Sequence, residues 1–252
     1  MGIFEKAVFM KSGPLFLCAL CLLIPLSISE AADPGFEASL GAYSSYIWRG
    51  FKLSDDALQI QPSTTFSING FSANIWANYD SDAEKCLEVD YTVSYARDFN
   101  RFNLELGYIH YDIRAGLDSD ELYMSTKYDS LLNPTITVYM DVNEGKGAFI
   151  VAGVNYPFKM NSRATMEFGA SASAVVNNGY VATNNRGEEF TGLFNCDLSA
   201  AASISLGERF SLEPMVGYTF SLSDDASYAI KNGSIEEDDA FFFAGLSVTA
   251  SF

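Results

Sequence analysis

Strict alternation of apolar and polar residues runs through most of this chain and never gives way to a helical period. In the stretch LQIQPSTTFSI, Leu58 and Ile60 fall on one side and Gln59 falls on the other. The pair Asn69-Gly70 follows, which is a strong signal for a two-residue β-hairpin turn. A period of two with one apolar and one polar face is typical of β-strands. We therefore predict one all-β domain of about twelve antiparallel strands, near 36–49, 58–68, 71–80, 87–97, 102–111, 121–129, 134–142, 148–158, 163–175, 192–206, 210–221 and 239–252.

The connections between these strands alternate in length. Tight turns fall at 69–70, 98–101, 130–133, 159–162 and 207–209, and longer, acidic connections fall near 50–57, 112–120, 176–191 and 222–238. An up-and-down barrel in a bacterial outer membrane has short periplasmic turns, longer external loops and an even number of strands. A soluble sandwich has no reason to alternate in this way. We predict a transmembrane β-barrel, and no segment predicts an amphipathic helix.

Residues 1–31 form a separate segment. Lys6 and Lys11 precede a short apolar stretch, PLFLCALCLLIPLS, and Ser29 and Ala31 supply small residues before position 32. This layout is typical of a cleaved secretory signal peptide, with an uncleaved anchor as the alternative. We therefore predict export through the periplasm to the outer membrane, and a barrel domain at 32–252.

Charge and cysteine content exclude several classes of function. The chain has 15 basic and 32 acidic residues, a net charge of -17, which argues against a nucleic-acid partner. Cys86 and Cys196 remain after cleavage and have no zinc-binding spacing, so we assign them no role, although one disulfide stays open. No cofactor or metal site is predicted.

Aromatic residues on the apolar face fall in two bands, as in the girdles of barrels in lipid. The predicted periplasmic band is Phe71, Tyr95, Phe102, Tyr128, Phe158, Phe210 and Phe252, and the outer band is Tyr46, Trp48, Tyr79, Tyr108, Tyr218 and Phe242. The final strand, LSVTASF, ends on an aromatic, which resembles the C-terminal signal of outer-membrane proteins. The predicted partners are outer-membrane lipid, small solutes or ions, and the barrel-assembly machinery, the last through Phe252.

The opposite, polar face predicts the wall of a lumen. Its acidic excess favours passive diffusion of cations or neutral solutes, because charged lumen side chains tune selectivity. The alternative is that these charges, with inward Trp76, Tyr123, Tyr139, Phe241 and Phe243, fill the lumen of a closed structural or ligand-binding surface barrel. The candidate lumen-facing residues are Arg49, Gln59, Gln61, Asn74, Trp76, Asn78, Glu88, Asp90, Arg97, Glu105, Glu121, Lys127, Asp129, Asp141, Glu167, Asp197 and Glu213.

Two further groups of residues are candidates for chemistry. His110, the only histidine, could serve a barrel lipase or acyltransferase, but no serine follows it within its strand, so we predict no catalytic residues. The external acidic pairs could bind Ca²⁺, although no spaced calcium loop is present.

The arginine in SYIWRG falls on the lumen parity, one residue after Trp48, at the external end of the first strand. Arg49 is either a basic group at the mouth of an otherwise acidic pore or one partner of a structural ion pair. We expect an ion pair with an inward carboxylate to be at least part of its role, while Tyr46 and Trp48 face lipid and Gly50 begins the first loop.

The stretch AYSSYIWRGFKLSDDALQIQPSTTFSINGFSANIWANYD resembles the opening of the TorF-like porin family, formerly known as the Gcw_chp domain. The matching elements are SSYIWRG, Ser54-Asp55, Leu58-Gln59 and the Gly70-Phe71-Trp76 set, with weaker echoes in LEVDYTVSYA, GYIHYD and ELYMSTKY. The chain has alanine where the family has proline before Leu58. The resemblance implies a signal-bearing outer-membrane barrel that acts as a porin, and it transfers no binding residues.

Overall fold

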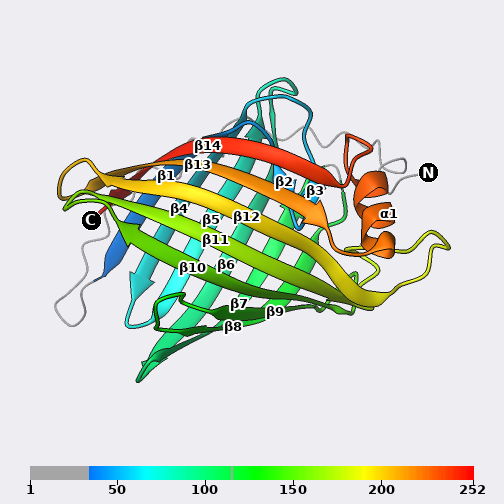
Figure 1. The fold of residues 1–252 in the computed structure, drawn as a ribbon, viewed down its shortest axis with the longest axis horizontal. Helices are drawn as coiled ribbons and strands as arrows, with labels where there is room; N and C mark the ends of the chain where they lie inside the picture. Colours follow the sequence, from blue (N-terminus) through cyan, green and yellow to red (C-terminus); the bar gives the residue numbers. More distant parts are fainter. Residues whose placement is uncertain (1–33, 115) are drawn as a thin grey trace.

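The computed structural model describes residues 34–114 and 116–252, and the predicted signal peptide at 1–31 lies outside these ranges. As predicted, the fold is all-β: twelve antiparallel strands close into one barrel (Figure 1). Each strand pairs with its neighbour along the chain, and β1 pairs with β14 to close the ring. The ring consists of β1 (Gly35–Tyr43), β4 (Gln59–Ile68), β5 (Phe71–Asp80), β6 (Lys85–Phe99), β7 (Phe102–Ile113), β8 (Ser119–Tyr128), β9 (Thr135–Asp141), β10 (Ala148–Lys159), β11 (Ala164–Val176), β12 (Thr191–Ser205), β13 (Phe210–Ser221) and β14 (Ala240–Ser251).

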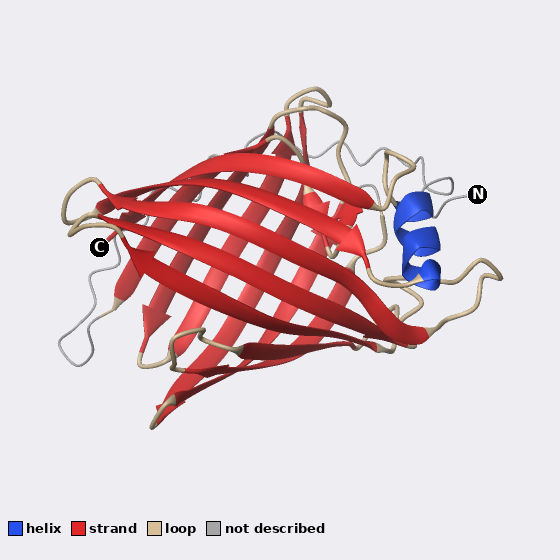
Figure 2. Cartoon of the chain, in the orientation of Figure 1, coloured by secondary structure: helices blue, strands red, loops and turns tan. Residues whose placement is uncertain are grey.

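The two ends of the barrel differ (Figure 2). One end, the short-turn end, carries the tight connections and the start of β1 and end of β14. At its first turn Asn69 and Gly70 have φ of 52° and 84°, the two positive values that a type I′ hairpin requires. The other end, the long-loop end, carries residues 44–58, 177–190 and 222–239. The connection at 81–84 is also at this end but is tight, so the alternation of loop lengths is not complete.

The outward face of the barrel is apolar. On β6, Tyr91, Val93 and Tyr95 are exposed, whereas Thr92 and Ser94 between them are half-buried. Near the short-turn end, aromatic rings on adjacent strands pack in pairs: Phe71 with Tyr95 at 4.7 Å and Phe102 with Tyr128 at 4.9 Å between centroids. Such pairs stabilise neighbouring strands through their side chains. The ring therefore exposes a continuous apolar belt and turns its polar residues inward.

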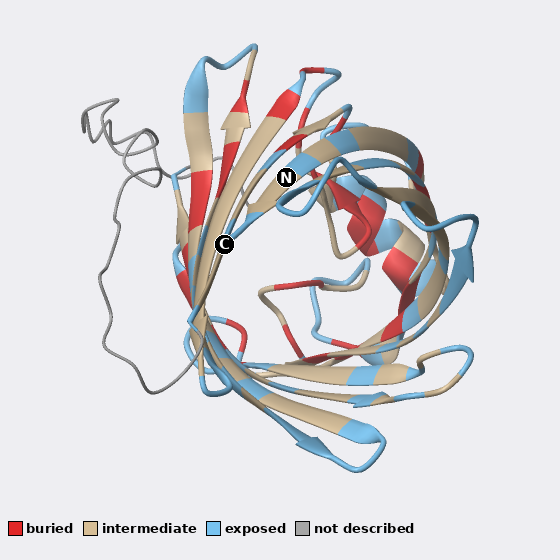
Figure 3. Ribbon diagram, turned by 90° about the vertical axis from the view of Figure 1, so that its left-hand side faces the viewer, coloured by how far each residue is buried: buried red, intermediate tan, exposed pale blue. Residues whose placement is uncertain are grey.

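Residues 44–58 depart from the expected first strand. β1 ends at Tyr43, and the chain then forms a separate two-stranded hairpin of β2 (Ile47–Trp48) and β3 (Phe51–Lys52), which we call the inward hairpin. Viewed along the barrel, loop segments lie inside the ring of strands (Figure 3). The prediction that Tyr46 and Trp48 face lipid was therefore wrong: Tyr46 is 7% exposed, and Trp48 packs on Phe51 and Tyr111. The tight turn at Arg49-Gly50 reverses the direction of the chain, so this segment does not extend β1.

A helix, α1 (Asp224–Gly233), stands in the connection between β13 and β14, where the sequence predicted none. Ser223 caps it by accepting a hydrogen bond from the amide of Ala226 at 3.2 Å. Its buried face joins an apolar cluster inside the long-loop end, made of Phe51, Phe149, Val175, Val181, Ala182, Phe190, Phe194, Ala226, Ala229, Ile230 and Phe241. This cluster, which we call the loop core, fills space that a wide-open channel would leave to water. No helix in the described ranges is long and apolar enough to cross a membrane.

Candidate functional site in the barrel lumen

The tip of the inward hairpin is a strained turn. Arg49 and Gly50 have φ of 50° and 85°, so an arginine occupies a left-handed position that normally favours asparagine or glycine. A Cβ atom on Gly50 would lie 3.0 Å from Cβ of Asn195 and 3.2 Å from Cδ1 of Ile230. The tip is thus pressed between strand β12 and helix α1. A residue held in such a conformation needs support from its surroundings.

That support comes from the side chain of Arg49. Its two terminal nitrogens lie 2.8 and 2.6 Å from the two carboxylate oxygens of Glu121, in a bidentate ion pair. The side chains of Arg49 and Glu121 are 8% and 2% exposed. Three aromatic rings surround the guanidinium carbon, at 4.6 Å for Trp48, 5.0 Å for Tyr139 and 4.5 Å for Phe149. The carboxylate that Arg49 meets is therefore Glu121.

This pairing spans the barrel. The hairpin belongs to the connection between β1 and β4, which are neighbours in the ring, whereas Glu121, Tyr139 and Phe149 lie on β8, β9 and β10. Strand β9 is six places from β1 in either direction around the ring of twelve, which puts it on the opposite wall. The inward hairpin therefore crosses the lumen and docks on the far side.

A second hydrogen bond attaches this segment to the wall, because the hydroxyl of Tyr46 donates to Glu88 at 2.8 Å. Within the wall, the hydroxyl of Tyr111 on β7 donates to Glu121 at 2.8 Å and so holds the carboxylate that pairs with Arg49. The ring of Tyr46 also packs against Trp76 at 5.6 Å between centroids. The carboxylates of Glu88 and Glu121 thus hold two points of the same segment. Residue periodicity placed both on the polar face but could not show that one loop joins them.

The connection that carries α1 clamps the hairpin from outside. The amide of Lys52 donates to the Ser234 hydroxyl at 3.0 Å, and its carbonyl accepts from the Ile235 amide at 2.9 Å. The ammonium group of Lys52 pairs with Glu236 and with Asp56. Burial lowers the pKa of Lys52, but these two carboxylates outweigh burial and leave that pKa above its usual value. Lys52 therefore stays charged and keeps both loops together.

The same connection is anchored to the wall through Asp239. The Ser221 hydroxyl donates to its carboxylate at 2.6 Å, and Lys231 of α1 lies 3.6 Å away. Hydrogen bonds from Ser221 and Ser227 lower the pKa of Asp239. The anionic form is thus the one that this anchor requires.

Most of the other predicted lumen residues form side-chain networks along the wall. Gln59 is fully buried and donates to Asp80 at 2.8 Å and accepts from Asn78 at 2.9 Å. Asp197 accepts from Asn195 at 2.9 Å and from Ser171 at 3.3 Å. The further contacts are Gln61 with Asn78, Asn74 with Ser63 and Thr65, Asp141 with Ser119, Glu105 with Tyr123, and Glu167 with Asn155, while Asp90 lies in register between Trp76 and Tyr111.

Four predicted lumen residues lie near the short-turn end, and all are exposed: Arg97, Lys127, Asp129 and Glu213. Two of these assignments need correction. Arg97 has the parity of Val93 and Tyr95, which belong to the outward face, and its guanidinium lies 5.4 Å from the ring of Phe99. Asp129 follows the end of β8 and belongs to the turn, where its amide donates to the Arg101 carbonyl at 2.7 Å. Odd or even position predicts which face a side chain takes only within a strand, so the prediction fails where the strand ends.

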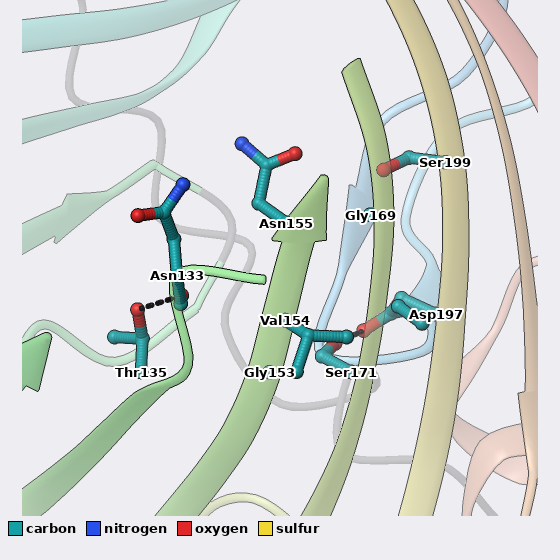
Figure 4. Close-up of a pocket in the computed structure, with 10 residues that line it drawn as sticks. Asn133, Thr135, Gly153, Val154, Asn155, Gly169, Ser171, Asp197 and Ser199 are labelled. Atoms are coloured by element: carbon teal, nitrogen blue, oxygen red, sulfur yellow. Dashed lines mark hydrogen bonds between the residues drawn. The ribbon is translucent and has the colours of Figure 1, made fainter. Parts of the chain in front are cut away.

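Two hollows open on the inner wall beyond the hairpin. One, of about 230 Å³, is lined by small and polar residues of β9 to β12, among them Thr135, Asn155, Ser171, Asp197 and Ser199 (Figure 4). The other, of about 330 Å³, is lined by Thr92, Glu105, Ile109, Tyr123, Ser125, Thr137 and Tyr139. Both carry carboxylates together with hydroxyl groups. Such walls suit hydrated or hydroxyl-bearing solutes.

The remaining candidate groups are His110, the metal-ligating side chains and the two cysteines. Nδ1 of His110 lies 2.8 Å from Asp120, which also accepts from the Tyr108 hydroxyl, so this histidine has a carboxylate partner that the sequence did not reveal. A hydrolase needs a nucleophile beside such a pair, and on its other contact the imidazole packs against the ring of Tyr91 at 6.2 Å between centroids. Within 34–114 and 116–252, no group of three or more metal-ligating residues could hold an ion. Within the described residues Cys86 and Cys196 form no disulfide, and the thiol of Cys86 lies 3.4 Å from the carbonyl oxygen of Glu88.

Comparison with solved structures finds barrels of the same kind. The NanC porin has a TM-score of 0.56 at 13% identity, over 85% of this chain and 98% of that chain. The KdgM porin has a TM-score of 0.55 at 11% identity, over 86% and 99%. An outer membrane channel from Pseudomonas putida F1 has a TM-score of 0.50 at 11% identity, over 90% and 97%. At these identities the likeness is one of fold. No protein-family model and no curated protein matches the chain.

Proposed function

We propose that this chain is an outer-membrane, porin-like channel for passive diffusion of small hydrophilic solutes, and that it belongs with the TorF-like porins. The observation that carries the proposal is a closed barrel with two hollows on its inner wall, each with a carboxylate beside hydroxyl groups. The belt of exposed apolar residues supports a position in lipid. Solved porins of the same fold support it further.

Selectivity follows from the sign of the charges along the path. Glu105 and Asp197 line the two hollows, and Arg49, the basic residue at the crossing, is neutralised by Glu121. The net field of the lumen is therefore negative, which favours cations and neutral solutes over anions.

A second candidate function is a closed surface barrel without transport. The specific observation in its favour is the loop core together with the inward hairpin, which occupy the long-loop end of the lumen. Under this alternative the buried ion pair has only a structural role.

Conductance of the purified protein in planar bilayers separates the two candidates. A channel gives single-channel currents, and in a KCl gradient the sign of its reversal potential shows a preference for K⁺. Glu105→Gln should lower that preference, whereas Glu188→Gln, a change at an exposed loop position, should leave it unchanged. Absence of current from a folded barrel, and of solute-driven swelling in liposomes, would overturn the channel in favour of the closed barrel.

A further inference from the structure

The far wall of the lumen contains a ready-made receptor for a planar cation. Glu121 presents both carboxylate oxygens to the guanidinium group of Arg49, and Tyr111 holds one of these oxygens by its hydroxyl at 2.8 Å. Tyr139 and Phe149 place their rings 5.0 and 4.5 Å from the guanidinium carbon. We call these four wall residues the guanidinium site. They lie on the four adjacent strands β7 to β10, so the site belongs to the barrel and not to the hairpin.

The chemistry of this site is specific. A carboxylate that accepts two parallel N–H bonds matches a guanidinium group, which is flat and carries its donors in a fork. Aromatic faces attract such a cation and stack on its plane. An ammonium group has neither the fork nor the flat face, and an anion would be repelled by Glu121.

The site also requires an occupant. Glu121 is 2% exposed, and a buried carboxylate that loses its partner is strongly destabilised. A site without Arg49 would have to take up either water or another cation. A soluble guanidinium compound would then restore the lost contacts.

Space for the rest of such a compound lies beside the site. The hollow of about 330 Å³ shares Tyr139 with the guanidinium site and continues along Glu105, Ser125 and Thr137. These groups supply a second carboxylate and hydroxyls for a polar or cationic tail. A small solute could therefore place its guanidinium group on Glu121 and its remaining atoms in this hollow.

We propose that the guanidinium site binds guanidinium-bearing solutes, and that Arg49 is a tethered competitor that occupies the site while the hairpin crosses the lumen. The proposal deepens the proposed channel function, on which it rests for the passage of the solute. Binding itself does not require that the channel conduct. The two can therefore be tested apart.

Binding is tested on the folded protein in detergent with ethylguanidinium, which reproduces the end of an arginine side chain. Isothermal titration calorimetry should show saturable binding to Arg49→Ala, and to Arg49→Met, which keeps more of the apolar stem and serves if the alanine variant folds poorly. Ethylurea, a neutral compound of the same shape, should not bind. Adding Glu121→Gln should weaken ethylguanidinium binding about 10- to 100-fold, the range expected for hydrogen bonds to a charged group.

The outcomes are distinct. The proposal requires that Arg49 blocks the site in the wild-type protein and that its removal opens the site. Equal binding of ethylguanidinium to the wild-type protein and to the Arg49 variants would therefore overturn it, and so would the absence of binding to folded variants. In planar bilayers, ethylguanidinium at concentrations that saturate binding should reduce the current of Arg49→Ala more than that of Arg49→Ala/Glu121→Gln. Binding in the absence of any current would support the site while overturning the proposed channel.

Discussion

At the scale of single residues, the molecule depends on an arginine in a backbone conformation that its side chain does not favour. The positive φ of Arg49 carries a steric cost of order 1–3 kcal/mol. A fully formed bidentate pair and three aromatic contacts offset that cost. The conformation of the turn and the pairing across the lumen therefore support each other.

Removing the charge of Glu121 should release the inward hairpin. Glu121→Gln leaves Arg49 buried without its counter-charge, a change that costs about 3–5 kcal/mol. Proteolysis follows the population of the open form, so trypsin should cut after Lys52, which is 6% exposed in the closed form, at least about 100-fold faster. Mass spectrometry of the fragments measures the rate. Glu188→Gln on an exposed loop is the control, and an unchanged rate in Glu121→Gln would contradict the docking described here.

At the scale of secondary-structure elements, the sequence predicts the ring better than what lies inside it. The twelve wall strands follow from the alternation of residues such as Leu58 and Gln59, because each strand must be apolar outside and polar inside. The sequence did not predict the inward hairpin, for two reasons. Tyr46 and Trp48 continue the apolar–polar alternation of β1, and Arg49-Gly50 lacks the asparagine or aspartate that marks a type I′ turn.

Helix α1 was also not predicted, because its local signals are short. It has ten residues, and although its buried residues Ala226, Ala229 and Ile230 have helical spacing, they are too few to distinguish a helix from a loop in the sequence. The one local signal was Ser223 followed by two aspartates, which resembles an N-cap with acidic residues in the first turn. The Arg49–Glu121 pair joins positions 72 residues apart. No local pattern can supply such a contact, although the need for some inward carboxylate was predictable.

Helix α1 should hold the long-loop end closed. Ile230 is fully buried against the tip of the hairpin, and Ile→Ala changes in cores cost about 2–5 kcal/mol. We expect Ile230→Ala to speed hydrogen exchange at 44–58 and 222–239 while the wall strands keep their protection. Tyr228→Ala, at an exposed position of the same helix, is the matched control. Equal effects of the two variants, or loss of protection in the wall, would contradict a loop core that opens separately.

The anchor at Asp239 should make this end sensitive to acid. Because the pKa of Asp239 is lower in the folded protein than in the unfolded chain, its stabilisation is complete above the ordinary pKa of about 4 and is lost as pH falls through the lowered value. Hydrogen exchange at 222–239, corrected for the intrinsic effect of pH, should therefore rise below about pH 4. Asp239→Asn should exchange faster at neutral pH and respond less to acid. An identical acid response in the two proteins would exclude this carboxylate as the cause.

At the scale of the whole molecule, the barrel wall is apolar outside and polar inside, the reverse of a soluble domain. One end of the barrel also contains an apolar core of the usual kind. The outward belt includes Leu106, which is 52% exposed, whereas Phe194 of the loop core is fully buried. An apolar exterior is stable only against lipid or detergent. The loop core has the buried apolar packing that stabilises a small soluble domain, and here that packing closes one end of the barrel.

A charge on the belt should be far more costly than a charge on the inner wall. Leu106→Arg, near the middle of β7, should destabilise the barrel in a bilayer by about 2–4 kcal/mol. Ser125→Arg faces the hollow and has Glu105 opposite it in register, so its cost should be smaller. Urea unfolding from lipid vesicles measures both. If the two substitutions cost the same, the belt does not face hydrocarbon.

The seam between β1 and β14 also imposes an order in time. Phe36 and Phe252 exchange both of their backbone hydrogen bonds, at 3.1 and 2.9 Å, and Glu37 meets Ser251, 214 residues further along the chain. Contacts between such distant positions form late, because a long loop must close first. Until β14 pairs with it, one edge of β1 has unpaired backbone groups that can pair with another strand. The barrel is therefore open to wrong strand pairing at this edge until β14 completes the ring.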